Sequence, residues 1–151
     1  MDFSEFAPHV DAAVARHQAL GLPDEMSPFE HLLASDEDLD RAERELGVRL
    51  PEQYKEFMKR YGGGAFASLD LLPVTPRDRE DLLEVNETER FSVPFVAIAP
   101  VGTGDWWGFK VNEGACSTEV SFYFFEEGSL ESESPDFLTF ATKQGLGIEY
   151  P

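Results

Sequence analysis

The side chains that could bind a metal are few and scattered. The three histidines, His9, His17 and His31, all lie near the N-terminus. His9 and His17 could share one helix face, but eight positions span more than two turns, which is too far for one metal ion. The sequence has no HExxH segment and no pair of cysteines to supply further ligands. We therefore expect no metal and no cofactor.

The single cysteine is a poor candidate nucleophile. Cys116 lies in the polar segment 112–117 among acidic residues, which raise the pKa of a thiol rather than lower it. One cysteine cannot form an internal disulfide, which favours a reducing compartment. The glycine clusters add no chemistry. Gly62–Gly64 is not followed by the Lys-Ser/Thr of a phosphate loop, and segment 102–104 is typical of a turn.

Carboxylates are abundant, and two groups of them flank a Gly-Ser turn: Glu126 with Glu127, and Glu131 with Glu133. Paired carboxylates can serve in acid–base catalysis or bind divalent cations. Their spacing is not that of a calcium loop, so we interpret them as a solvated, flexible loop that could steer a partner electrostatically. A small carboxylate-dependent enzyme is the weakest of the functional hypotheses.

The charge balance excludes several classes of partner. Thirty acidic residues against twelve basic ones give a formal charge of -18, which argues against nucleic-acid binding and against docking on anionic lipid. The longest apolar segment, 93–101, is too short to span a membrane. The N-terminus has acidic residues and no apolar run, unlike a secretory signal. We expect a cytoplasmic protein with no membrane or nucleic-acid partner.

The hydrophobic pattern predicts one compact domain of the α+β class, in which helices flank a largely antiparallel sheet. Residues 1–34 form an N-terminal helical preface, with a second short helix starting at Ser27-Pro28, and residues 35–151 form the main domain. Helices are expected at 36–46, at 51–61, at 76–86 capped by Thr75, and at 135–143 capped by Ser134. Strands are expected at 65–72, 94–99, 105–111 and 118–125.

Alternation along two of these strands suggests a binding surface. The face that holds Trp107 and Phe122 is expected to be core. The opposite face mixes aromatic and charged residues, and such a mixture can anchor a partner. The candidate partner-binding residues are Trp106, Tyr123, Phe125, Glu126 and Glu127. The alternative is that loops or the N-terminal preface cover this face, which leaves it without a binding role.

The segment from Ser35 to Gly64, SDEDLDRAERELGVRLPEQYKEFMKRYGGG, is the most distinctive. Ser35 and Asp38 can form a capping box, and the helix that follows can end at Gly47 in a left-handed conformation. Pro51 suits the first turn of a second helix. Residues at helical spacing give that helix an apolar face, and the glycines stop it.

This ordered set resembles the signature of the SUKH superfamily, which includes the Smi/Knr cell-wall regulators and many bacterial toxin-immunity proteins. The resemblance extends from Ser35 to about Gly145 and implies an α+β fold without enzymatic activity. It implies a bacterial immunity protein that neutralises a cognate toxin by stoichiometric binding, with a basic toxin domain as the partner. The alternative within the superfamily is an intracellular adaptor or regulator of the Smi/Knr type. The oligomeric state is left open.

Overall fold

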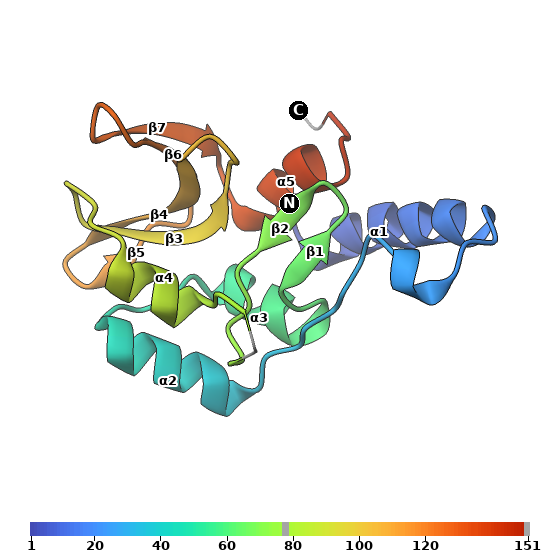
Figure 1. Ribbon diagram of the computed structural model, residues 1–151, viewed down its shortest axis with the longest axis horizontal. Coiled ribbons are helices and arrows are strands. Elements are labelled where there is room, and N and C mark those ends of the chain that lie inside the picture. Colours follow the sequence, from blue (N-terminus) through green and yellow to red (C-terminus); the bar gives the residue numbers. More distant parts are fainter. Residues whose placement is uncertain (77–78, 150–151) are drawn as a thin grey trace.

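The computed structural model describes residues 1–76 and 79–149 and has the predicted α+β architecture in one domain (Figure 1). The helices are α1 (Phe3–Gln18), α2 (Asp36–Leu46), α3 (Glu52–Arg60), α4 (Leu82–Thr88) and α5 (Phe137–Phe140), with a 3-10 turn η1 (Asp24–Met26) and a π-helical turn η2 (Ala141–Gly145). The strands are β1 (Gly64–Phe66), β2 (Leu69–Leu71), β3 (Phe95–Pro100), β4 (Trp106–Asn112), β5 (Ala115–Cys116), β6 (Val120–Phe124) and β7 (Ser129–Ser134).

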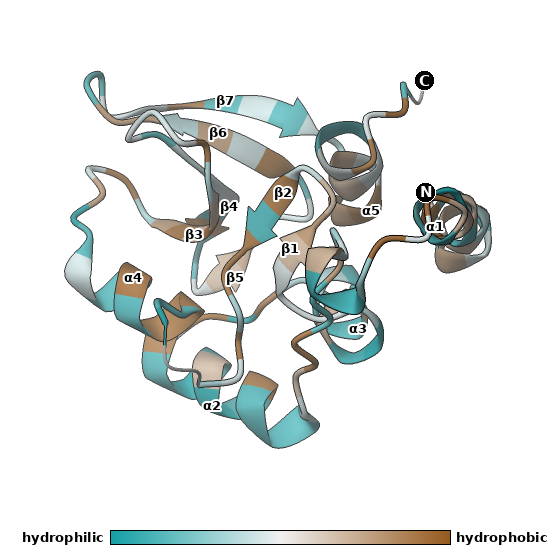
Figure 2. Cartoon of the chain, turned by 45° about the vertical axis from the view of Figure 1, so that its right-hand side comes forward, coloured by the Kyte–Doolittle hydropathy of each residue, from teal (hydrophilic) through white to brown (hydrophobic). Residues whose placement is uncertain are grey.

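The main sheet has five antiparallel strands in the order β3-β4-β6-β7, and the short β5 pairs with β4. A separate two-stranded sheet is formed by β1 and β2. In Figure 1, α2 and α4 lie below β3, and α1 lies on the other side of β1 and β2 from the main sheet. The helix α5 follows β7 and packs on β4, where Phe140 contacts Trp107 and Phe137 contacts Phe109. Figure 2 shows that β7 carries mostly hydrophilic residues whereas β3 is hydrophobic, as expected of an exposed strand and an interior-facing strand.

The helix pair at 35–64 forms as its sequence predicts. Ser35 and Asp38 make a complete capping box at the start of α2, and Gly47 ends that helix with φ +67°. Pro51 is the N-cap of α3 rather than its first helical residue. The segment beyond Gly47 turns sharply, so that the two helices can share one core beside Leu50 and Phe57, both buried.

The N-terminal segment packs into the same core as the rest of the chain. Phe6 of α1 is fully buried, with its ring centroid 5.8 Å from that of Phe57 and 6.1 Å from that of Phe66. The predicted short helix after Ser27-Pro28 is wrong. This segment is extended, because Glu30 N–H donates to Ala65 O and Leu32 N–H donates to Gly63 O, which pairs its backbone with the start of β1.

Three element boundaries differ from the sequence prediction. The strand expected at 65–72 is instead the β1–β2 hairpin, which turns at Ala67 with φ +52°. The helix expected at 76–86 is α4, capped by Asp81; residues 77 and 78 lie outside the described residues. The last helix is capped by Asp136 rather than Ser134, because the Asp136 carboxylate accepts the N–H of Thr139.

The largest omission of the sequence analysis is β7. Residues 129–134 pair with β6, with a bulge at Glu133, instead of forming a flexible loop. The alternating Ser and Glu residues hide this strand, since they have low strand propensity and place little apolar surface on either face. In the described part of the chain, no helix is both long and apolar enough to cross a membrane.

Candidate functional site

The end of the β6–β7 hairpin carries three of the five predicted partner-binding residues. Phe125, Glu126 and Glu127 follow β6 and are exposed, and Phe125 has 61% of its surface accessible. Gly128 closes the turn with φ +66°, and its N–H donates to Phe124 O at 2.8 Å. We call Phe125, Glu126 and Glu127 the hairpin ridge.

A carboxylate from the β3–β4 loop fixes the ridge in place. Asp105 Oδ1 accepts the backbone N–H of Phe125 at 2.8 Å, and Asp105 Oδ2 accepts the hydroxyl of Thr103 at 2.6 Å. The Thr103 hydroxyl and then the Phe125 N–H hold the pKa of Asp105 below its ordinary value, since both bonds favour the charged carboxylate. The acidic turn is therefore anchored to the neighbouring loop.

The hairpin ridge separates two hollows on the surface. A hollow of about 190 Å³ is lined on one side by Thr103, Asp105 and Phe124. An open hollow of about 470 Å³ on the other side is lined by residues of the segment before β3 and of the hairpin: Arg90, Phe91, Ser92, Tyr123 and Gly128. The ridge residues line both hollows. An exposed phenyl ring beside carboxylates suits a partner that presents basic and apolar groups together.

Tyr123 does not belong to an exposed aromatic face. Only 3% of its surface is accessible, and its ring packs against Phe91 and Phe95 with centroid distances of 5.1 Å and 5.4 Å. Phe91 and Ser92, in the segment between α4 and β3, cover Tyr123, so the alternative of a loop over this face holds at this residue. Trp106 lies opposite Tyr123 in the register, is half-buried, and lines neither hollow of the ridge.

The face predicted to be core is buried at only one end. Phe109 and Val120 are fully buried, but Trp107, Phe122 and Phe124 are half-buried. The reason is the length of α5, which spans only four residues. Its rings reach Phe109 and Trp107, whereas Phe122 and Phe124 lie one strand further along the sheet, where they pair with residues of β7.

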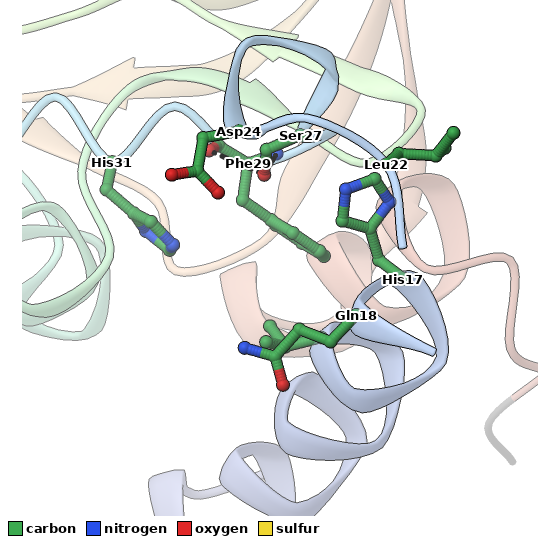
Figure 3. Close-up of a pocket in the computed structure, with 8 residues that line it drawn as sticks. His17, Gln18, Leu22, Asp24, Ser27, Phe29 and His31 are labelled. Carbon is green, nitrogen blue, oxygen red and sulfur yellow. Dashed lines mark hydrogen bonds between the residues drawn. The ribbon is translucent and has the colours of Figure 1, made fainter. Parts of the chain in front are cut away.

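The N-terminal histidines do not form a metal site. His17 and His31 both line a cavity of about 310 Å³, together with Asp24 and Phe29. Figure 3 shows Phe29 between the two histidines. The His31 ring stacks on Phe29, and its Nδ1 lies 2.9 Å from Tyr61 O, to which it donates as the Nδ1-H tautomer. Within residues 1–76 and 79–149, no group of three or more His, Cys, Asp or Glu side chains could hold a metal ion.

Cys116 is placed as a structural residue. Burial, and to a smaller extent the nearby Glu43 carboxylate, raises the pKa of its thiol to about 12. The thiolate, which is the nucleophilic form, is therefore scarce at neutral pH. The backbone of Cys116 instead joins β5 to the helix pair, because its N–H donates to Arg49 O at 2.9 Å.

Comparison with known families agrees with the fold and with the helix-pair motif. A family model described as SMI1-KNR4 cell-wall matches residues 36–140. The match covers α2 to α5 and the whole main sheet, and it leaves out α1, η1 and η2. A comparison with curated proteins gave no match.

Proposed function

The chain belongs to the SMI1-KNR4 family of the SUKH superfamily, and from this premise we propose that it is a non-enzymatic protein-binding domain that acts as an immunity protein. In this role it neutralises a cognate toxin by stoichiometric binding. The partner is a basic toxin domain that is held against the acidic hairpin ridge and is thereby kept from its substrate.

The observation that carries this proposal is the hairpin ridge itself. Among the described residues from α2 onward, Phe125 is the one large apolar side chain that is exposed, and two carboxylates follow it directly. An aromatic anchor with a charged surround supplies much of the energy of a protein interface. Because the Phe125 N–H is already bonded to Asp105, the hairpin ridge loses less conformational entropy when a partner binds.

The charge of the whole chain supports a basic partner. With a formal charge of -18, the domain projects a negative field that attracts a basic protein and repels an acidic one. Toxins that act on nucleic acids need positively charged surfaces, and an acidic protein can compete for such surfaces.

A regulatory adaptor of the Smi/Knr type is the second candidate. The family description supports it, since it names the cell wall. Genome context separates the two candidates, because an adjacent gene for a large secreted toxin favours immunity. An enzymatic role has the least support, since Cys116 has a raised thiol pKa and the histidines His17 and His31 are separated by Phe29.

The test is capture of the partner from the native organism with the tagged full chain, followed by co-expression with the partner. We expect to capture a basic protein at a 1:1 ratio, and we expect co-expression of the chain to suppress the toxicity of that protein. A variant with Phe125→Ala, Glu126→Lys and Glu127→Lys should lose both capture and protection. A charge-matched control with Glu25→Lys and Glu45→Lys, two exposed residues remote in sequence from the ridge, should keep both. A partner that shows no toxicity would instead support the adaptor role.

A further inference from the structure

The two edges of the main sheet differ in how they are closed. The β3 edge is covered, because the Asn86 side chain donates to Ala97 O at 2.9 Å and accepts the Ala97 N–H at 2.8 Å. Leu72 N–H continues this cover by donating to Ile98 O at 2.9 Å. The β7 edge has no such cover: within the described residues, segment 129–134 makes backbone pairs with β6 alone (Figure 1). An open edge offers a row of N–H and C=O groups to another strand.

The charges around this edge favour an added strand that is positively charged. From Val111 to Thr142 the sequence has no Lys, Arg or His, and it has seven carboxylates, namely Glu113, Glu119, Glu126, Glu127, Glu131, Glu133 and Asp136. Two β7 edges would bring like charges together, which disfavours pairing between copies of this chain. A strand that carries Lys or Arg would meet opposite charges along the same edge.

Glu131 is the carboxylate best placed to meet such a strand. Glu119 already accepts a hydrogen bond from the Ser132 hydroxyl, and Glu133 accepts one from Gln144. Glu131 lies on the edge strand itself and is exposed, and its carboxylate makes no hydrogen bond or ion pair with any other described residue. Its charge is therefore available to an incoming cation.

An aromatic row leads across the sheet to Glu131. Trp107 pairs with Phe122, and Phe122 pairs with Glu131, so the three side chains lie in one line on one face. The Trp107 and Phe122 ring centroids are 6.3 Å apart, and Phe122 and Phe124 are 4.6 Å apart. A guanidinium group can stack on such rings while it pairs with a carboxylate. The chain already uses this contact once, since Arg60 Cζ lies 4.4 Å from the ring centroid of Phe3.

We propose that β7 accepts an extended basic segment of the partner protein as an additional strand of the main sheet. The backbone of this segment pairs with the open edge of β7. Its arginine side chains on the aromatic face lie over Phe122 and Phe124 and pair with Glu131. The proposal rests on the proposed function in that the partner is a protein, and it deepens that function by naming the contacting segment and its chemistry.

The edge can be tested without the natural partner. The probe is a ten-residue peptide of alternating arginine and valine, added to the full chain while amide hydrogen exchange is followed residue by residue. We expect exchange to slow at alternate amides of 129–132, ahead of the bulge at Glu133, because an added strand pairs with every second residue. Two control peptides complete the design: one with glutamate in place of arginine, and one with the same arginines but with proline in place of valine, which keeps the charge and cannot pair as a strand.

Glu131→Lys should weaken binding of the arginine–valine peptide roughly tenfold, while the matched Glu45→Lys control should change it about twofold or less. The proposal is overturned if this peptide does not bind, if it binds without slowing exchange in β7, if the proline peptide binds equally well, or if Glu131→Lys has no larger effect than its control. The two proposals fail separately. If a captured partner binds and exchange in β7 is unchanged, strand addition is wrong and protein binding still holds. If no partner is captured, the proposed function is wrong, and the peptide experiment still decides whether β7 accepts a basic strand.

Discussion

The Tyr123 hydroxyl accepts the backbone N–H of Ser92 at 3.0 Å and lies 3.1 Å from the Ser92 hydroxyl. The Ser92 hydroxyl in turn donates to Gly128 O at 2.8 Å. This chain of bonds ties the segment before β3 to the turn of the β6–β7 hairpin. Tyr123 therefore supports the hairpin ridge from beneath, while Phe125 is presented to the outside.

Tyr123 and Phe125 should give opposite results on substitution. Tyr123→Phe removes the bonds to Ser92 and should lower the free energy of unfolding by about 1 kcal/mol, with little change in partner affinity. Phe125→Ala should change stability by less than about 0.5 kcal/mol, because the side chain is exposed, and it should weaken partner binding. Urea denaturation and a binding titration on both variants are the measurements. The reverse pattern would show that the ridge is assigned to the wrong residue.

Gly47 should be required for its backbone conformation alone. It ends α2 with φ +67°, and a Cβ atom at this position would meet nothing within 4 Å. Gly47→Val should therefore cost about 1–2 kcal/mol through backbone strain, while Gly47→Asn should cost less, because Asn tolerates the left-handed region. Thermal unfolding compares the two variants. Equal melting temperatures for Gly47→Val and the unsubstituted chain would contradict this role of Gly47.

The capping box should make part of the stability depend on pH. The Ser35 N–H, and also the Thr75 hydroxyl, donate to the Asp38 carboxylate and hold its pKa below the ordinary 3.8. A lowered folded-state pKa gives stability that is present above pH 3.8 and is lost as pH falls through the folded-state value. Asp38→Asn should therefore be less stable than the unsubstituted chain at pH 7, and the difference should shrink below about pH 3.5.

Denaturation at pH 7 and at pH 3 measures this difference in unfolding free energy. Asp40→Asn, an exposed substitution on the same helix, is the matched control and should show little difference at either pH. A gap for Asp38→Asn that grows toward low pH would contradict the lowered pKa.

The helix pair was predictable because its signals are local. Capping at Ser35, the turn at Gly47 and the apolar spacing of α3 depend on residues within one or two turns. The sheet faces were harder, since alternation shows which residues share a face but not what covers it. Tyr123 was assigned to an exposed face because nothing in its neighbourhood indicates that Phe91 and Phe95 pack over it.

Only part of the candidate site could be predicted from the sequence. Phe125 is predicted to bind a partner from the alternation along its strand, and Glu126 and Glu127 from their place beside a Gly-Ser turn. The role of Asp105 depends on a hydrogen bond between residues 20 positions apart, and no short-range pattern predicts it. The strand β7 was missed because its edge position tolerates Ser and Glu, which in most sequences indicate a loop.

Cys116 should be slow to react in the folded protein. A thiol pKa near 12, raised by burial and by Glu43, leaves little thiolate at pH 8. Alkylation by iodoacetamide at that pH should be at least about a hundredfold slower than in the unfolded chain. Cys116→Ser should keep partner binding intact. Fast alkylation of the folded protein, or loss of binding in Cys116→Ser, would indicate a functional thiol.

The central claim is that an acidic surface captures a basic protein, and the association rate across a salt series tests it most directly. Stopped-flow mixing of the chain with its captured partner should give a rate well above the ~10⁵–10⁶ M⁻¹s⁻¹ of unsteered association at low salt. The rate should fall steeply as ionic strength rises, because screening shortens the reach of the charges to about 10 Å at 0.1 M. The dissociation rate should change much less with salt and should rise in Phe125→Ala. An association rate that barely responds to salt, or a natural partner that is itself acidic, would contradict the electrostatic mechanism.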